Sequence, residues 1–366
     1  MSATRDPSSD RTMWTSLLHA GLAGSFMGFP HVAAETEALV EAGARAAVYG
    51  IPFDGTNISR TGANYGPRGM RDVSVQFLTY NAMYDFDVAE ALSPVDCGDC
   101  AVIPGDTAGT FARAQADLEA ILRADALPVT LGGEHSITIP AVRAVASVVG
   151  NPGLVLVDTH LDTAMDVGGE PLSHCCPITR AVDAGFDPQH IALVAISGWM
   201  NPRSELAFCR EHGITVIWLE EIWEHGTAWA VDRALEVAGG GTDGVYLSFD
   251  VDSLDAAHAP GTCCPTPGGL TSREALEIVR GVSGPGLIGV DVVEVAPSLD
   301  PTPATALIGG RVALEAMAFH AGAGSTAGLG PGAGASAGAG FVVGAIERRS
   351  ARRRGRACDA EEESDV

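Results

Sequence analysis

Two short stretches of the sequence place carboxylate and imidazole side chains at alternate positions behind an apolar run. In VLVDTHLD (155–162) and SFDVD (248–252), these side chains are Asp158, His160, Asp162, Asp250 and Asp252. Alternate side chains of a strand point to the same face, so each set is expected to converge. Buried carboxylates are costly unless a cation meets them, which makes a bound metal ion the expected partner.

A third stretch, LGGEHSITIP (131–140), leaves an apolar run through two glycines and places His135 in the loop that opens a helix. Oxygen donors with a minority of imidazole suit Mn²⁺ or a related divalent ion better than they suit a thiolate-bound zinc. The carboxylates of the three stretches would balance two divalent ions, whereas one ion would leave excess buried negative charge. Two metals can share a water and lower its pKa, which predicts a hydrolase.

The elements that must position these residues alternate along the chain, short β-rich runs with longer helical patterns. The expected strands are 45–51, 127–131, 153–157, 190–196, 214–219, 244–249 and 287–292, and helical patterns cover 110–124, 204–212, 228–238 and 272–280. This rhythm predicts an α/β fold with a largely parallel sheet covered by helices on both faces. Sites in such sheets form beyond the carboxyl ends of the strands, where Asp158 and Asp250 fall.

Composition narrows the function class. The net charge of −24 disfavours a nucleic-acid partner and favours small cations. No apolar run is long enough for a membrane span, and the N-terminus lacks the pattern of a secretory signal. Eight cysteines are too few for a disulfide scaffold, so we expect a cytoplasmic protein. The expected organisation is a mobile segment at 1–14, a catalytic domain at 15–320, and a Gly/Ala-rich linker with a charged, disordered tail at 321–366.

Over residues 45 to 320 the chain resembles the ureohydrolase family, which includes arginase, agmatinase and guanidino-acid hydrolases, and it is most similar to agmatinase and guanidino-compound hydrolases. The motifs that carry the resemblance are GIPFDGTNISRTGANYGPRGMR (50–71), GGEHS (132–136), DTHLD (158–162), SFDVDSLD (248–255), APGT (259–262) and DVVEVAPSLD (291–300). The resemblance implies a three-layer α/β/α sandwich with a central parallel sheet, and a homo-oligomer, either a trimer or a hexamer.

The resemblance also implies roles for individual residues. One metal would be held by His135, Asp158, Asp162 and Asp250, and the other by Asp158, His160, Asp250 and Asp252. Asp162 would in addition hold the attacking hydroxide and pass its proton to the departing amine. Glu294 would pair with the substrate's guanidinium, a role that suits a carboxylate. His174 would bind substrate and shuttle protons. The implied activity is hydrolysis of a guanidino C–N bond to urea and an amine.

Two cysteine pairs depart from the family pattern. The family commonly reads HGTP where this chain has HCCP (174–177), and PGTGTPEPGG where this chain has PGTCCPTPGG (260–269). Three interpretations stay open for Cys175, Cys176, Cys263 and Cys264. They are small apolar packing, a reshaped substrate pocket, and extra thiolate ligands or a redox switch. A separate pair in CGDC, residues 97–100, is expected to be structural.

The substrate is the least determined feature of the sequence. The loop 163–173 lacks the asparagine expected of a reader of an α-amino acid. Its acidic Asp166 and Glu170 would repel a carboxylate and attract an amine, which favours agmatine over arginine. Arg60, if it reaches the pocket, would instead favour a guanidino acid. Guanidine or a biguanide, hydrolysed with Ni²⁺ in place of Mn²⁺, is an alternative.

Two further classes compete with this interpretation. Single-zinc deacetylases share the fold and use an Asp-His-Asp set, but His135 and the second aspartate pair point to two metals. A non-catalytic subunit of a mixed oligomer is the other alternative, which the complete ligand set, Glu294 and His174 disfavour.

Overall fold

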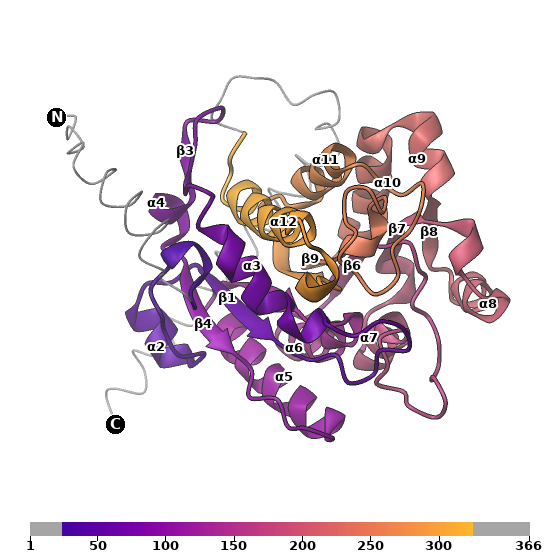
Figure 1. Ribbon diagram of the computed structural model, residues 1–366, viewed down its shortest axis with the longest axis horizontal. Helices are drawn as coiled ribbons and strands as arrows, with labels where there is room; N and C mark the ends of the chain where they lie inside the picture. The colour runs from indigo at the N-terminus through magenta and orange to yellow at the C-terminus, as the bar shows by residue number, and fades with distance from the viewer. Residues whose placement is uncertain (1–23, 325–366) are drawn as a thin grey trace.

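The computed structural model describes residues 24–324 and is built around an eight-stranded sheet in the order β4-β1-β5-β10-β9-β6-β7-β8 (Figure 1). Every adjacent pair of strands runs parallel, so the predicted parallel sheet is confirmed. The strands are β1 (Ala46–Ile51), β4 (Val95–Asp99), β5 (Leu127–Gly132), β6 (Pro152–Val157), β7 (Ile191–Ile196), β8 (Thr215–Trp218), β9 (Gly244–Asp250) and β10 (Leu287–Val293), with a separate antiparallel pair, β2 (Tyr80–Asn81) and β3 (Phe86–Asp87).

Helices cover both faces of the sheet and give the predicted three layers (Figure 1). Those packed into one core are α3 (Gly66–Ser74), α4 (Val88–Leu92), α9 (Leu219–His225), α10 (Thr227–Gly239), α11 (Ser272–Val282) and α12 (Ala304–His320). Those packed into the other are α2 (Thr36–Glu41), α5 (Thr107–Arg123), α6 (Thr138–Val148), α7 (Pro177–Ala184) and α8 (Arg203–His212). Strand β6 serves both cores by alternation, with Val155 and Val157 on one side and Leu154 and Leu156 on the other.

The edge strand β4 was not predicted, because its sequence VDCGD contains two acids and a glycine. Its central Asp96 is buried and pairs with Arg71 of α3. The guanidinium Nε lies 2.8 Å from one carboxylate oxygen and Nη2 lies 2.9 Å from the other. This two-point ion pair lets a charged side chain occupy a buried strand position.

The chain order within the sheet explains how the site is brought together. After β6, the chain runs outward through β7 and β8 and then returns to place β9 and β10 between β6 and β5. The adjacent strands β5, β10, β9 and β6 therefore end at one edge, which is where ligands bind in open α/β sheets.

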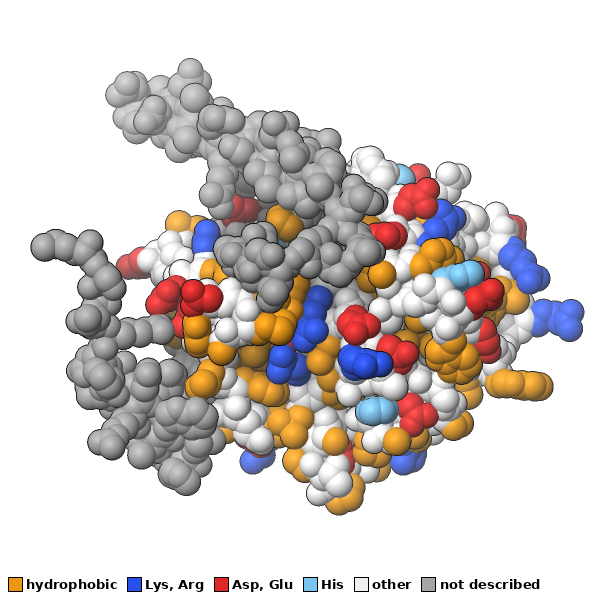
Figure 2. Space-filling view, turned by 90° about the horizontal axis from the view of Figure 1, so that it is seen from above, with side chains coloured by type: hydrophobic (Ala, Val, Ile, Leu, Met, Phe, Trp, Pro, Cys, Tyr) orange, Lys and Arg blue, Asp and Glu red, His pale blue; other side chains and the backbone are white. Residues whose placement is uncertain are grey.

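The surface shown in Figure 2 carries arginine and acidic side chains interspersed with one another. None of the described helices is long and apolar enough to cross a bilayer. The predicted mobile segment at 1–14 lies outside the described residues, as do residues 325–366 of the linker and charged tail predicted at 321–366, and the boundaries of the catalytic domain stay a prediction.

Candidate metal centre and active site

The predicted site residues gather where the four central strands end. His135 follows β5, Glu294 follows β10, Asp250 ends β9, and Asp158 follows β6. His135, Asp250 and Glu294 line a cavity of about 240 Å³, and Asp158 lies 3.0 Å from His135. The predicted residues that line this cavity are His135, His160, Asp162, His174, Asp250, Asp252 and Glu294.

The convergence of these side chains comes from turns and not from strand alternation, which corrects the prediction. Strand β6 ends at Val157, so the following ligands lie in a loop. The carboxylate of Asp158 accepts a hydrogen bond from the backbone N–H of His160 at 2.6 Å. The same contact joins Asp250 to the N–H of Asp252 at 2.7 Å. An aspartate that accepts from the residue two positions on folds that residue back toward itself, so each pair converges.

The first group of donors surrounds the imidazole of His135. Its Nδ1 lies 3.0 Å from Asp158 Oδ2, 2.9 Å from Asp162 Oδ2 and 3.1 Å from Asp250 Oδ2. This nitrogen is not paired with one particular carboxylate, because oxygens of three carboxylates surround it at nearly equal distances. His135, Asp158 and Asp250 have donor atoms within 4.8 Å of one another, as one metal ion requires.

A second group of donors adjoins the first. His160 Nδ1 lies 3.2 Å from Asp252 Oδ2 and 3.3 Å from Asp158 Oδ1. The donor atoms of these three residues also lie within 4.8 Å of one another. Asp158 belongs to both groups and turns one oxygen toward each, so its carboxylate is placed to bridge two ions.

The state of the buried polar atoms tests whether metal ions fit. His135 Nδ1, Asp158 Oδ2 and Asp252 Oδ1 are buried and have no hydrogen-bond partner. Burial and the neighbouring carboxylates raise the pKa of Asp250 well above its ordinary value, and burial raises the pKa of Asp252 to about 7. Such crowding of buried acids is relieved by cations. The residues therefore fit a pair of divalent metal ions.

A chain of hydrogen bonds behind His135 orients its ring. Nε2 lies 3.0 Å from Ser248 Oγ, and the Ser248 hydroxyl donates to Asp291 at 2.6 Å. Tyr246 and Thr138 also donate to Asp291, at 2.8 and 3.0 Å. Ser248 begins the SFDVDSLD motif and Asp291 begins the DVVEVAPSLD motif. Their supporting role was not predicted, because only the fold brings them behind His135.

Glu294 and His174 are neighbours in the lining of the same cavity. Glu294 adopts a left-handed backbone conformation with φ of 62°. Its Oε1 accepts from the backbone N–H of His135 at 2.9 Å and lies 3.4 Å from His174 Nδ1. Although burial lowers it, hydrogen bonds with Cys175 and Glu294 raise the pKa of His174 above its ordinary value. Glu294 Oε2 and His174 Nε2 are buried without partners, which leaves both atoms for a bound molecule.

A buried acid that was not predicted as a site residue supports His174. Glu134 is fully buried, and burial raises its pKa to about 7. Its Oε1 accepts from the N–H of Thr56 at 3.0 Å and from the hydroxyl of Ser136 at 2.7 Å. The Thr56 hydroxyl oxygen in turn accepts from the N–H of His174 at 3.1 Å. Hydrogen bonds of Thr56 thereby join the loop after β1 to the loops that carry Glu134 and His174.

Asn201, which precedes α8, and Glu205 within α8 hold the loop that carries Asp162, whose φ of 50° is also left-handed. The Leu161 N–H donates to Asn201 Oδ1 at 2.7 Å, and the Thr163 N–H donates to Glu205 Oε2 at 3.2 Å. Asn201 and Glu205 line the cavity as well. Neither was predicted, since each lies some forty residues beyond the loop it holds.

The structure does not bring Asp166 or Arg60 to the cavity lining. Asp166 is exposed, and its carboxylate accepts from the Gly169 N–H at 2.9 Å, which closes its own turn. The Arg60 guanidinium donates to the backbone carbonyl of Cys263 at 3.1 Å and also to that of Thr262. Its role is to hold the second cysteine loop.

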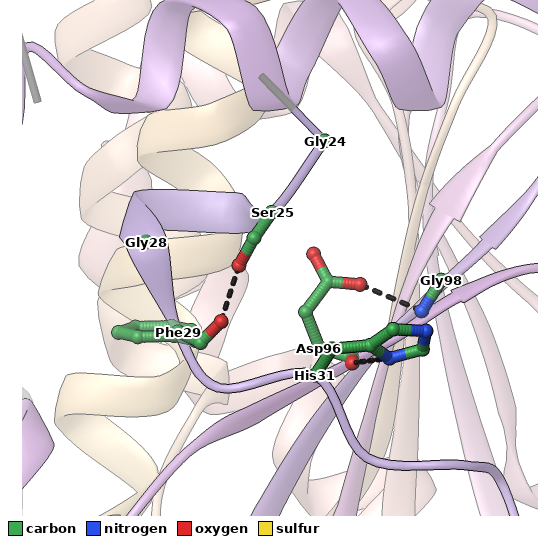
Figure 3. Close-up of a pocket in the computed structure, with 7 residues that line it drawn as sticks. All are labelled: Gly24, Ser25, Gly28, Phe29, His31, Asp96 and Gly98. Carbon is green, nitrogen blue, oxygen red and sulfur yellow. Dashed lines mark hydrogen bonds between the residues drawn. The ribbon is translucent and has the colours of Figure 1, made fainter. Parts of the chain in front are cut away.

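A second cavity, of about 320 Å³, lies beside β4 (Figure 3). Its lining is Gly24, Ser25, Gly28, Phe29, His31, Asp96 and Gly98. The polar groups there bond to each other: Asp96 accepts from the Gly98 N–H at 2.8 Å, and His31 Nδ1 lies 2.9 Å from the Asp96 carbonyl oxygen. Among the described residues, the donor clusters that could hold a metal lie in the first cavity and not here.

The sheet and the donor set define an α/β protein with a carboxylate–histidine centre whose donor groups could hold metal ions. The profile of the arginase family matches residues 44–319, and the chain therefore belongs to this family, the ureohydrolases, which confirms the predicted enzyme class. It is 37% identical to mitochondrial agmatinase of Gallus gallus, over 75% of this chain and 80% of that protein. It is 36% identical to guanidinobutyrase of Pseudomonas aeruginosa, over 80% of this chain and 90% of that protein.

Solved structures agree with this assignment. Proclavaminate amidino hydrolase from Streptomyces clavuligerus superposes with a TM-score of 0.73 at 32% identity, over 81% of this chain and 97% of that one. The fold class predicted from the sequence, a three-layer α/β/α sandwich, is thus confirmed by both the sheet topology and the solved relatives.

Proposed function

We propose that the chain is a binuclear metal-dependent amidinohydrolase that cleaves a guanidino C–N bond and releases urea and an amine. The observation that carries the proposal is the pair of donor groups joined by Asp158, next to an unpaired oxygen of Glu294 in the same cavity. The named relatives, an agmatinase and a guanidinobutyrase, support it.

The proposed ligands of one ion are His135, Asp158, Asp162 and Asp250, and those of the other are Asp158, His160, Asp250 and Asp252. Their carboxylate-rich character favours Mn²⁺, with Ni²⁺ as the alternative. When bound, two divalent ions supply charge compensation and a water that is acidic enough to react near neutral pH.

The chain's own side chains then bind, orient and move protons. Glu294 accepts N–H groups of the guanidinium through its unpaired Oε2, which fixes the guanidinium carbon over the aspartates. Asp162 takes a proton from the attacking water and gives it to the amine nitrogen as the C–N bond breaks. His174 exchanges protons between this site and solvent through its unpaired Nε2.

The remaining lining of the cavity bears on the substrate's tail. Apart from the proposed ligands, His174 and Glu294, the lining residues are Ile58, Cys175, Met200, Asn201, Pro202, Glu205, Cys263 and Cys264. No arginine or lysine is among them to pair with a carboxylate, whereas Glu205 can pair with an amine. We therefore propose agmatine or a similar guanidino compound with a cationic or neutral tail, rather than a guanidino acid or arginine.

A urea-release screen with Mn²⁺- and Ni²⁺-loaded protein tests this function. The substrates are agmatine, guanidinobutyrate, guanidinopropionate, arginine, guanidine and a biguanide, and agmatine should give the highest kcat/KM. A higher kcat/KM for guanidine or a biguanide than for agmatine would instead support the alternative that the protein hydrolyses those compounds. No urea from any of them with either metal would point to a non-catalytic subunit.

Metal content and one variant complete the test. The purified protein should hold two ions per chain, and one tightly bound zinc would favour the deacetylase alternative. Glu294→Gln should keep both ions but lower kcat/KM by about 10- to 150-fold, since a hydrogen bond to a charged group contributes about 1.5–3 kcal/mol. We also infer a cytoplasmic homo-oligomer, a trimer or hexamer, from the family resemblance; the native mass by light scattering checks the assembly.

A further inference from the structure

Two adjacent cysteines in the cavity wall have their sulfur atoms in contact. Cys263 Sγ and Cys264 Sγ lie 3.6 Å apart, although neighbouring side chains of an extended chain normally point in opposite directions. Both residues line the catalytic cavity, Cys263 buried and Cys264 partly buried. The loop that carries them reads PGTCCP, with Pro260 at its start and Pro265 directly after Cys264.

Contacts from the loop that follows β1 fix this pair in place. The thiol of Cys263 donates to Asn57 Oδ1 at 3.1 Å, and Arg60 donates to the carbonyl oxygen of Cys263 at 3.1 Å. Asn57 Nδ2 is buried without a partner. Asn57 Oδ1 also accepts the backbone N–H of Ser59 at 2.8 Å, which holds the amide with its oxygen toward the Cys263 thiol.

The environment also favours ionisation of one of the two sulfurs. A hydrogen bond from the Cys264 thiol lowers the pKa of Cys263 below the ordinary value of a thiol. The thiolate is the form in which cysteine binds metals and attacks electrophiles.

The distance between the sulfurs indicates what the pair suits. Two thiolates on one tetrahedral ion, with metal–sulfur bonds of about 2.3 Å, lie about 3.8 Å apart. The sulfurs of a disulfide are only about 2.05 Å apart. The observed 3.6 Å is close to the chelating distance, so a bridging ion needs little movement of the loop.

We propose that Cys263 and Cys264 form a two-sulfur chelating site for a soft, thiol-seeking centre, a zinc-group ion or trivalent arsenic, in the wall of the catalytic cavity. This site is chemically distinct from the oxygen-rich centre, because soft ions select sulfur and hard ions select carboxylate oxygen. Glu294 lines the same cavity, so an occupant of the dithiol site narrows the space in which a substrate would lie.

Phenylarsine oxide is the probe, because it needs two thiols and has little affinity for carboxylates. Its reaction with a dithiol forms two As–S bonds and one water, and arsenic stays trivalent throughout: C₆H₅AsO + 2 RSH → C₆H₅As(SR)₂ + H₂O. The Mn²⁺-loaded full chain should gain one phenylarsenic group by intact mass spectrometry. A small dithiol such as 2,3-dimercaptopropanol should remove it, whereas a monothiol should not.

Four variants locate the adduct. Cys263→Ser and Cys264→Ser should each lose it, and Cys264→Ala repeats the test if either serine variant melts at a lower temperature than the wild type. Cys175→Ser is the matched control, because Cys175 lines the same cavity from another loop and should leave the adduct intact. The adjacent-pair site would be overturned if the wild type forms no adduct. It would also be overturned if the Cys263 and Cys264 variants keep the adduct, or if Cys175→Ser loses it.

The effect on turnover rests on the proposed function, whereas the adduct itself does not. If the wild type releases urea, the arsenical should reduce that rate at least tenfold and the dithiol should restore it. Unchanged turnover with a full adduct would overturn only the claim that the occupant blocks the cavity; the dithiol site itself would stand. A wild type that releases no urea but forms the adduct would leave the dithiol site standing and refute only the amidinohydrolase proposal.

Discussion

His135 Nε2 lies 3.0 Å from the hydroxyl oxygen of Ser248, and that hydroxyl donates its own proton to Asp291 at 2.6 Å. Ser248 can therefore only accept from the ring, which keeps the proton on Nε2 and leaves Nδ1 bare. Nδ1 is the atom that faces Asp162 and the other carboxylates. A serine thus sets the imidazole tautomer that a metal ligand requires.

Removal of this hydroxyl should weaken metal binding. Ser248→Ala is expected to lower metal affinity by about 10- to 100-fold, the usual effect of removing a group that orients a ligand. Competition with a chelating dye measures the affinity. Ser283→Ala is the control, because the Ser283 hydroxyl is also buried but has no partner. Equal affinity in Ser248→Ala and wild type would contradict the role.

Asp162 should be essential for turnover but not for folding. Asp162→Asn removes a proposed metal ligand and proton carrier, so urea release should fall by at least about 10²-fold, while the circular dichroism spectrum stays that of the wild type. Asp166→Asn serves as a control, since this carboxylate is exposed and lies outside the cavity lining. Its activity should match the wild type, and full activity of Asp162→Asn would refute the assignment.

The two residues of the first cysteine pair should differ in their effect on specificity. Cys175 lines the cavity, whereas Cys176 is fully buried at the start of α7. Cys175→Gly should change the ratio of kcat/KM for agmatine to that for guanidine, because it alters the wall that the tail meets. Cys176→Thr should leave the ratio unchanged and lower only the melting temperature. An unaltered ratio in Cys175→Gly would favour the packing interpretation.

Glu315 should make stability depend on pH in the acid range. This buried carboxylate lies 2.9 Å from Arg280 Nη2 and 2.8 Å from Arg311 Nε. Burial raises the pKa of Glu315, but the hydrogen bonds to Arg280 and then Arg311 outweigh burial and lower it below its ordinary value. The ionised form is thus favoured by folding, so its contribution is complete above the unfolded pKa of about 4.3 and is lost as pH falls through the folded pKa.

The measurement is the melting temperature between pH 7 and pH 3. Glu315→Gln should melt below the wild type at pH 7, and the two curves should approach each other as pH falls below about 4. Glu277→Gln, a more exposed acid on α11, provides the control. A constant difference between Glu315→Gln and wild type across this range would show that the ion pairs do not cause the dependence.

Much of the fold and the ligand set could be predicted because both depend on local patterns. The strands that end at Asp158 and Asp250 are apolar runs, and the motif around His135 has a specific spacing. The prediction erred where local geometry changes, since β6 ends before Asp158 and a turn directs His160. Strand β4 was missed because its Asp96 depends on Arg71, a partner 25 positions away.

The supporting residues could not be predicted because their partners are distant in the chain. Ser248 lies 113 positions from His135, and Thr56 lies 118 positions from His174. The cysteine pairs were visible in the sequence, but the contact between the Cys263 and Cys264 sulfurs depends on backbone angles that composition does not encode.

The position of β10 has a consequence for the order of assembly. Among the strands of the described residues 24–324, β10 is the last to be synthesised, and it is the one that lies between β5 and β9. A nascent chain that stops before Leu287 has its sheet in two pieces, with His135 on one and the aspartates on the other. The two halves each expose an unpaired strand edge until β10 arrives, so the donor group around His135 can be assembled only after nearly the whole domain has been synthesised, whereas Asp158, His160 and Asp252 already lie on one piece.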